Sequence, residues 1–240
     1  MKRLNKTGFT IVELMIATSI LSVILVTVTV VMVGIGNLYY KGINQINIQD
    51  TTRNISDEIS QKLQLSDGMN LDHEVLPTDH NIQAYCIGST RYTYVLNHQM
   101  GDHDDSSPYM HVLWRDSISS GACGTAIPDL KQPNISGSTD GVELLGNHSR
   151  LTEFDIAPPN LKTSPYTLTV GVAYGDNDLL CNTGVSGDCD ASDDTAQHQK
   201  NLGMDGTVSH PLGGIICRGS TGQQFCATSH LQVIVAKRLG

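Results

Sequence analysis

An uninterrupted apolar stretch near the start of the chain limits its possible folds more than any other feature. The stretch is GFTIVELMIATSILSVILVTVTVVMVGIGNLYY at residues 8–40, and its only charged residue is Glu13. The run from residue 14 to residue 40 is longer than the ~20 residues that an α-helix needs to cross the hydrocarbon of a bilayer. The sequence therefore predicts a membrane-spanning helix, with a carboxylate where an unpaired charge is costly and usually functional.

A basic leader precedes this stretch. It has the sequence MKRLNKTG and carries Lys2, Arg3 and Lys6 without an acidic residue. Together with FTIVEL at residues 9–14, the leader resembles the processing site of type IV pilins and of the pseudopilins of type II secretion. The resemblance covers residues 1–40. It implies that a prepilin peptidase cuts between Gly8 and Phe9 on the cytoplasmic side, and that Phe9 is then N-methylated.

The position of this cut agrees with the physical character of the segment. An ordinary secretory signal is cut after its apolar region, whereas a cut after Gly8 leaves the helix in the mature protein. Cleavage exposes an α-amine on Phe9, one helical turn from Glu13. This amine is largely cationic at neutral pH, so it can neutralise the Glu13 carboxylate of its own chain or of an adjacent subunit. We therefore expect Glu13 to serve assembly; the alternative is an incidental polar residue in an ordinary anchor.

After residue 40 the pattern becomes that of an amphipathic helix. Side chains suited to burial recur at spacings of three and four, on one helical face, at Ile48, Thr52, Ile55, Ile59 and Leu63. We predict one helix over residues 9–66, apolar all round in its first half and packed on a sheet in its second half. The Asp67-Gly68 pair that follows is typical of a helix end.

The membrane half of this helix contains Gly34 and Gly36 but no proline. Many pilins carry a helix-bending proline in this half, and Val30 occupies that region here. Each glycine destabilises a helix by ~1 kcal/mol relative to alanine, but small residues also allow close packing between membrane helices. Whether the helix melts near the two glycines on assembly therefore stays open.

The rest of the chain has the pattern of short strands and turns. Apolar runs predict strands at residues 82–87, 91–96, 110–115, 142–145, 151–156, 166–174, 214–218 and 225–236. A helix followed by strands without further helices predicts an α+β fold, pilin-like by the resemblance, with the helix packed on an antiparallel β-sheet head. Two polar, acidic segments, residues 97–108 and 175–206, are expected to be loops.

Four parts of the chain follow from these patterns. Residues 1–8 are the cleaved leader and residues 9–40 the transmembrane and polymerisation helix. Residues 41–68 are the amphipathic continuation of that helix, and residues 69–240 form an extracellular β-rich head. The formal net charge of the chain is −9, and losing a basic leader makes the mature protein more acidic. This charge argues against nonspecific binding of nucleic acid by the head as a whole.

Six cysteines occur in the head. In a chain that is directed outward, oxidation to disulfides is the usual state. Their order favours the sequential pairs Cys86–Cys123, Cys181–Cys189 and Cys217–Cys226 among fifteen possible connectivities. A structural zinc site is a weaker alternative, because no CxxC spacing occurs.

No strong catalytic or metal-binding motif is present in the sequence. Weak calcium candidates are the carboxylates of Asp188, Asp190, Asp193 and Asp194, since calcium prefers oxygen ligands. The EF-hand pattern fails, because Asp193 stands where the sharp-turn glycine belongs; a solvated acidic loop is the simpler interpretation. The chain also lacks HExxH, GxSxG and GxxxxGK[ST] patterns. We therefore expect neither an enzyme nor a cofactor.

The resemblance, together with the layout of the head, implies a structural subunit, a minor pilin of a type IV pilus or related filament. Positive-inside bias places its N-terminus in the cytoplasm and its head outside the cytoplasmic membrane. Its expected partners are prepilin peptidase, other pilin subunits and a membrane assembly platform, and its final location is an extracellular filament. The alternatives are a type II secretion pseudopilin and a single-pass anchored binding or adhesion protein that does not polymerise. The sequence does not decide between adhesion, motility, DNA uptake and secretion, and it names no surface ligand.

Overall fold

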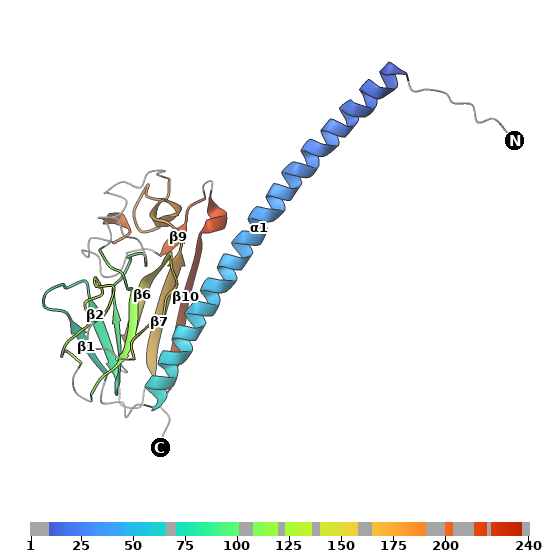
Figure 1. The fold of residues 1–240 in the computed structure, drawn as a ribbon. Helices are drawn as coiled ribbons and strands as arrows, with labels where there is room; N and C mark the ends of the chain where they lie inside the picture. Colours follow the sequence, from blue (N-terminus) through green and yellow to red (C-terminus); the bar gives the residue numbers. More distant parts are fainter. Residues whose placement is uncertain are drawn as a thin grey trace. The chain divides into compact units, whose positions relative to one another are not determined.

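A computed structural model describes residues 10–65, 71–100, 108–119, 123–135, 140–157, 165–190, 200–203, 214–219 and 222–236. One long helix, α1 (Ile11–Leu65), begins the described chain (Figure 1). It confirms the predicted helix, although residues 66–70, with the expected stop, lie outside the described residues. The chain divides into two units, residues 1–40 and 41–240, so the first part of α1 belongs to one unit and its last part to the other.

The described part of the second unit contains three antiparallel sheets. The largest has the order β1-β2-β3-β4-β5, with strands Leu71–Val75, Gln83–Ile87, Thr90–Tyr94, Leu113–Ser117 and Val142–Glu143. The second has the order β10-β7-β6, with strands Ala227–Val235, Tyr166–Tyr174 and Ser149–Ala157. The third pairs β8 (Leu180–Asn182) with β9 (Ile215–Cys217), and two short 3-10 helices are η1 (Asn177–Leu179) and η2 (Gln223–Phe225). A long helix packed on antiparallel sheets is the α+β fold that the sequence predicts.

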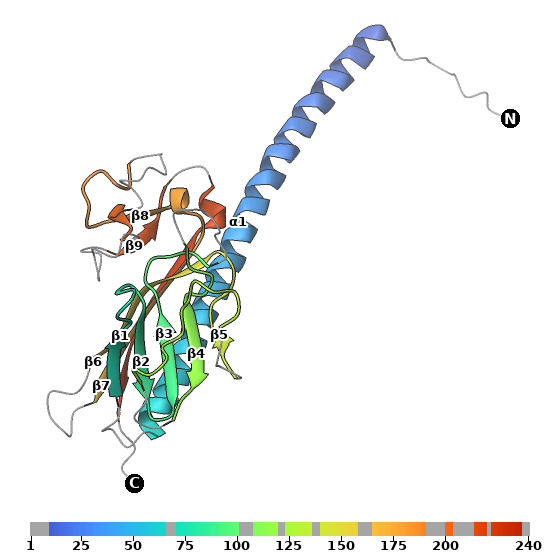
Figure 2. The ribbon, with the colours of Figure 1, turned by 60° about the vertical axis from the view of Figure 1, so that its left-hand side comes forward.

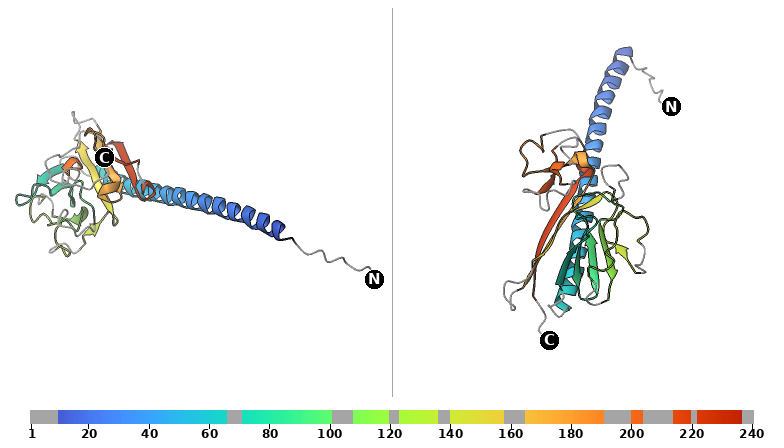
Figure 3. Two further views of the ribbon diagram at one scale, coloured as in Figure 1. Left: turned by 90° about the horizontal axis from the view of Figure 1, so that it is seen from above. Right: turned by 90° about the vertical axis from the view of Figure 1, so that its left-hand side faces the viewer.

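The last part of α1 packs through the face that its periodicity predicts. Ile48, Thr52, Ile55, Ile59 and Leu63 are all buried, and the four aliphatic members share one core with both large sheets. Figures 1 and 3 show this part of the helix beside β10, and Figure 2 shows it behind β3 and β4. Burial of one aliphatic side chain contributes about 1.5–3 kcal/mol, so docking of the helix is mainly hydrophobic.

Polar contacts fix the position of the helix along the strands. Asn44 and Gln45 donate side-chain hydrogen bonds to the backbone carbonyls of Gln224 and Thr228, at 2.9 and 3.0 Å. Further along, Glu58 accepts a hydrogen bond from a tyrosine of β3 at 3.0 Å and pairs with an arginine of β4 at 2.9 Å. Because apolar packing alone is not directional, these contacts set the register of α1 on the sheets.

Aromatic rings join the two large sheets. Phe154 of β6 contacts Tyr85 of β2 and Tyr94 of β3 edge-on, with ring centroids 5.7 and 4.8 Å apart. All three rings are buried, and edge-to-face pairs of this kind add about 0.5–1.5 kcal/mol beyond the area that they bury. The two sheets and the last part of α1 therefore form one packed body.

Three disulfides are present: Cys86–Cys123, Cys181–Cys189 and Cys217–Cys226. These are the pairs that the order of the cysteines favours. A buried ion pair lies beside the first of them, because Arg91, the strand neighbour of Cys86, pairs with Asp116 on β4. Arg91 Nε donates to Asp116 Oδ1 at 3.0 Å, and Arg91 Nη1 donates to the carbonyl of Thr125 at 2.9 Å. The disulfide and the ion pair thus hold the same segment, residues 123–125, against the sheet.

Two strands are absent from the sequence-based prediction. Strand β1 is an edge strand with mostly exposed side chains, so its sequence LDHEV shows no apolar alternation. Strand β8 and η1 lie inside residues 175–206, which we expected to be a loop. That expectation is wrong at residues 177–182, which form η1 and β8, whereas residues 183–190 contain only turns and bends. The segment is also not wholly exposed, because Leu180 and Leu202 are buried in a small second core with Ile215.

Candidate assembly site

The described chain begins with a hydrogen-bonded turn around Glu13. Thr10 donates to Glu13 Oε2 from its backbone N and from Oγ1, each at 2.9 Å. In return, the backbone N of Glu13 donates to Thr10 Oγ1 at 3.3 Å. This reciprocal arrangement is a capping box, which satisfies backbone donors at a helix start. Glu13 therefore has a partner within its own chain.

Thr10 is a site residue that our sequence analysis missed. Its signal is the pattern Thr-x-x-Glu at residues 10–13, which marks a capping box when it precedes an apolar run. Gly8 and Phe9 lie outside the described residues. The cut between them, and the pairing of the Phe9 amine with Glu13, therefore stay predictions.

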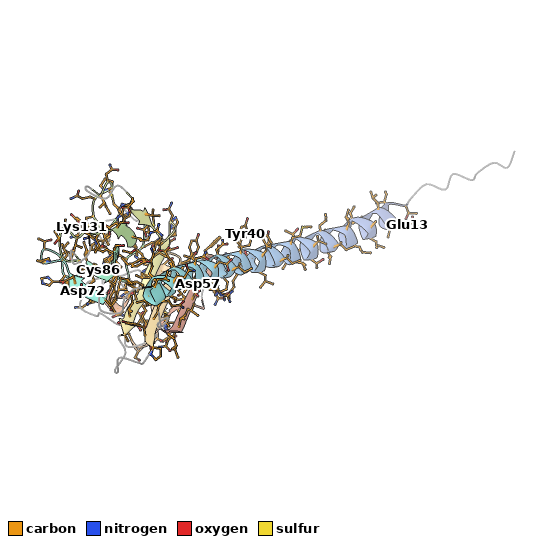
Figure 4. All side chains as sticks on the ribbon, turned by 90° about the horizontal axis from the view of Figure 1, so that it is seen from below. Glu13, Tyr40, Asp57, Asp72, Cys86 and Lys131 are labelled. Carbon is orange, nitrogen blue, oxygen red and sulfur yellow. A yellow bond between two sulfur atoms is a disulfide. The ribbon has the colours of Figure 1, made fainter. Side chains whose placement is uncertain are left out.

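The first part of α1 exposes apolar side chains on every side. Over residues 11–38 the large apolar side chains are 45–79 % exposed. Figure 4 shows side chains that project from all sides of the helix between the labelled Glu13 and Tyr40. Such a surface is far larger than the apolar patches of soluble proteins, and the helix is long and apolar enough to cross a membrane. It needs an apolar environment, supplied by lipid or by other helices.

The serine and threonine hydroxyls of the first part of α1 are satisfied within the helix. The side chains of Thr18, Ser19, Ser22, Thr27 and Thr29 each donate to a backbone carbonyl three or four residues earlier, at 2.7–3.1 Å. Polar groups in lipid must find partners inside the protein, and these hydroxyls do so without another subunit. The segment can therefore pass from lipid into a bundle of helices without leaving these donors unpaired.

Three glycines occur where the helix leaves its apolar stretch. Added Cβ atoms at Gly34, Gly36 and Gly42 would meet nothing within 4 Å, and α1 continues through all three positions. None of them is required by a close contact within the described chain. Their small size leaves room for the backbone of another helix to approach closely at these positions.

The structure describes two of the four acidic candidates in the head, Asp188 and Asp190. Asp188 is buried, and its carboxylate accepts hydrogen bonds from the backbone N of Asn182 and from Asn201 Nδ2, both at 2.8 Å. The expectation of a solvated loop is therefore wrong for Asp188, whose oxygens hold two chain segments together. Asp190 is exposed, whereas residues 191–199, with the other two candidates, are not described. No cluster of three or more potential metal ligands occurs among the described residues.

A buried arginine anchors the beginnings of both acidic segments. Arg150 of β6 is 1 % exposed. Its Nη2 donates to Gln99 Oε1 at 3.2 Å, to the Gly175 carbonyl at 3.2 Å and to Asn177 Oδ1 at 2.7 Å. Residues 97–100 belong to no helix or strand, as expected of a loop, although residues 97–99 are buried; residues 101–107 lie outside the description. Sequence patterns did not reveal Arg150, because its partners are distant in the chain.

Four buried tyrosines among the described residues of the head have raised pKa values. Burial raises the pKa of Tyr85 to about 12, and the nearby carboxylate of Asp155 acts in the same direction. Burial likewise raises the pKa values of Tyr92, Tyr94 and Tyr109. These hydroxyls donate hydrogen bonds within the head, so they stabilise its packing in the protonated form.

One comparison with known proteins locates a family feature in this chain. A family model described as the prokaryotic N-terminal methylation motif matches residues 3–29. No curated protein and no solved structure matches the chain. The matched residues include residues 3–8 of the basic leader, the Gly8-Phe9 bond, the Thr10–Glu13 capping box and the first part of the apolar helix.

Proposed function

We propose that this chain, which carries at residues 3–29 the methylation motif of type IV pilin-like and pseudopilin proteins, is a minor pilin. Prepilin peptidase cuts it between Gly8 and Phe9, and Phe9 is N-methylated. Before assembly, the mature protein lies in the cytoplasmic membrane with its head outside. It then joins other pilin subunits through its helix, at an assembly platform in the membrane, and enters a type IV pilus or related extracellular filament.

The observation that carries this proposal is the continuity of the motif with an apolar helix that lacks partners of its own. The methylation motif runs directly into α1, whose side chains over residues 11–38 are exposed on all sides. A cut before such a helix preserves it, so the mature protein keeps a surface that only lipid or other helices can cover. A head with its own disulfides and core is suited to stand outside the cell on such a helix.

The partner of the Glu13 carboxylate is proposed to change when the subunit passes from the membrane into the filament. The carboxylate bonds to Thr10 in the single chain, and an incoming α-amine can add an opposite charge at this position. A carboxylate in apolar surroundings is costly unless it is paired. Attraction between Glu13 of one subunit and the Phe9 amine of another would therefore help to set the register of assembly.

The first experiment tests processing. Mass spectrometry of the purified membrane protein should find methylated Phe9 at its N-terminus. The variant Gly8→Ala should keep its leader, whereas the control Gly36→Ala should be cut normally. An intact Met1 in the wild type, or a cut after the apolar stretch, would refute the proposed processing.

The second experiment tests assembly. The fraction of subunit in sheared filaments, relative to the membrane pool, should fall for Glu13→Gln, which keeps the shape of the side chain. The control Asp50→Asn removes an exposed carboxylate elsewhere on α1 and should assemble like the wild type. An unchanged fraction for Glu13→Gln would contradict the role of Glu13. Wild-type protein that never enters filaments would instead favour an anchored binding protein, and export without surface fibres would favour a pseudopilin.

A further inference from the structure

Two adjacent tyrosines end the apolar part of α1. Tyr39 and Tyr40 are 66 % and 56 % exposed, and their rings meet edge-on with centroids 6.2 Å apart. They are the only aromatic residues between residues 10 and 40, and Lys41 follows them immediately. The pair therefore stands where the chain changes from apolar to charged, and Tyr40 is labelled there in Figure 4.

Tyrosine at such a boundary matches the chemistry of lipid headgroups. Its ring is apolar while its hydroxyl needs a polar partner, so tyrosine is enriched where hydrocarbon meets water. The lysine that follows can reach toward lipid phosphates while its carbon chain stays near the hydrocarbon. We infer that Tyr39 and Tyr40 form an anchor in the outer headgroup layer, and that this anchor holds Glu13 in the inner headgroup layer of the free subunit. The inference rests on the membrane crossing contained in the proposed function.

The length of the helix carries the second half of this inference. The helix rises 1.5 Å per residue, so Glu13 and Tyr39 lie about 39 Å apart along its axis. At an average tilt of ~20° the separation across the bilayer is still about 37 Å, which exceeds the ~30 Å of hydrocarbon. Both ends cannot lie inside the hydrocarbon at once. With the tyrosines at the outer boundary, the hydrocarbon ends near Thr18 and Ser19.

The first turn of the helix then lies beyond the hydrocarbon. The hydroxyls of Thr18 and Ser19 donate hydrogen bonds to the carbonyls of Met15 and Ile16, at 3.1 and 2.9 Å. Because these hydroxyls need no outside partner, the two residues can lie in the hydrocarbon or in the headgroup layer. Glu13 lies more than one turn further out, where water and headgroups hydrate its carboxylate. The cost of burying that charge would therefore arise only when the helix enters a filament, where a neighbouring amine is at hand.

Depth-dependent quenching of tryptophan fluorescence tests this arrangement. The full chain is placed in vesicles of phosphatidylcholine and phosphatidylglycerol, whose lipids carry bromine either near the headgroup or near the chain end. Single reporters are Tyr40→Trp, Met15→Trp and, as the control inside the hydrocarbon, Val28→Trp. The native Trp114 lies in the head. Its fluorescence, measured in the wild-type protein, is subtracted from the signal of each variant.

Reporters at positions 40 and 15 should be quenched most by the bromine near the headgroup, and the reporter at 28 by the deep bromine. Stronger deep quenching at position 15 would place the first turn in the hydrocarbon and overturn the inference. If neither lipid quenched the reporter at position 40, the inference would also be overturned. The same holds if quenching at position 40 weakened as the protein-to-lipid ratio rose, because the tyrosines would then face another copy of the chain. The vesicles contain no assembly machinery, so these outcomes are independent of whether the protein enters filaments.

Discussion

Loss of the Cys86–Cys123 disulfide should destabilise the head more than loss of any other disulfide. The bond closes the longest loop, with a sequence separation of 37 residues, against 9 for Cys217–Cys226. On the chain-entropy model a loop of this length contributes about 4 kcal/mol, and the shorter one about 2.7 kcal/mol. For a head of this size, 4 kcal/mol corresponds to a fall in Tm of about 8–16 °C.

The structure explains why the native state should survive this loss. Arg91 remains paired with Asp116, and its hydrogen bond to the Thr125 carbonyl still holds the segment that follows Cys123. The double variant Cys86→Ala/Cys123→Ala should therefore keep the native fold at low temperature and unfold earlier on heating. Its effect arises mainly from the greater freedom of the unfolded chain.

Thermal unfolding of the full chain in detergent micelles measures the effect. Fluorescence of Trp114, the only tryptophan, reports on the head alone. The matched control is Cys217→Ala/Cys226→Ala, which removes a shorter loop. If the Cys86/Cys123 variant lost no more stability than this control, loop closure would not be the main contribution of the bond. If it failed to fold at low temperature, the ion pair would not suffice to hold the segment.

Three further predictions concern the helix start and the head. Thr10→Val should speed amide hydrogen exchange over residues 11–14, because it removes the capping hydroxyl. The control Thr29→Val, in the middle of the helix, should leave exchange over these residues unchanged. Equal exchange rates in Thr10→Val and the wild type would refute the capping role. Arg150→Met should destabilise the head by about 2–4 kcal/mol, because it leaves buried acceptors unpaired, whereas exposed Arg53→Met should change the denaturation midpoint little. Because burial raises the pKa of Tyr85 to about 12, the folded head keeps a proton that the unfolded chain loses near pH 10. The free energy of unfolding should therefore fall between these pH values, and a Tyr85→Phe variant whose stability falls just as steeply over this range would contradict the role of Tyr85.

The features that the sequence predicts best are those with a strong local period. The buried face of α1 follows the helical repeat from Ile48 to Leu63. Strand Tyr166–Tyr174 has the predicted bounds, because most of its residues are β-branched or aromatic and so favour a strand. In both cases the pattern depends only on residues close in the chain, so no distant partner is needed to recognise it.

The features that the sequence misses depend on distant partners. Strand β4 was expected at residues 110–115 but runs over Leu113–Ser117. Asp116 lies within the strand because its carboxylate pairs with Arg91 on β3. Arg150 is buried by residues 97–99 and 175–177, which approach it only after folding. A charged residue reads as exposed in a sequence unless its partners are known. At the helix start the missed signal was local, because Thr10 and Glu13 form a recognisable capping pattern.

The two units of the chain differ in whether they bury their own apolar side chains. Residues 41–240 bury an apolar core, join it with three disulfides and pair charged groups within it. Over residues 11–38, in contrast, the helix satisfies its serine and threonine hydroxyls but leaves its apolar surface uncovered. Substitutions in the two units should therefore separate in experiment. Glu13→Gln should change where the protein accumulates without lowering the Tm of the head, whereas Arg150→Met should lower that Tm before it affects processing. A Glu13→Gln variant with a destabilised head would show that the units are coupled, and that the helix does more than anchor and assemble.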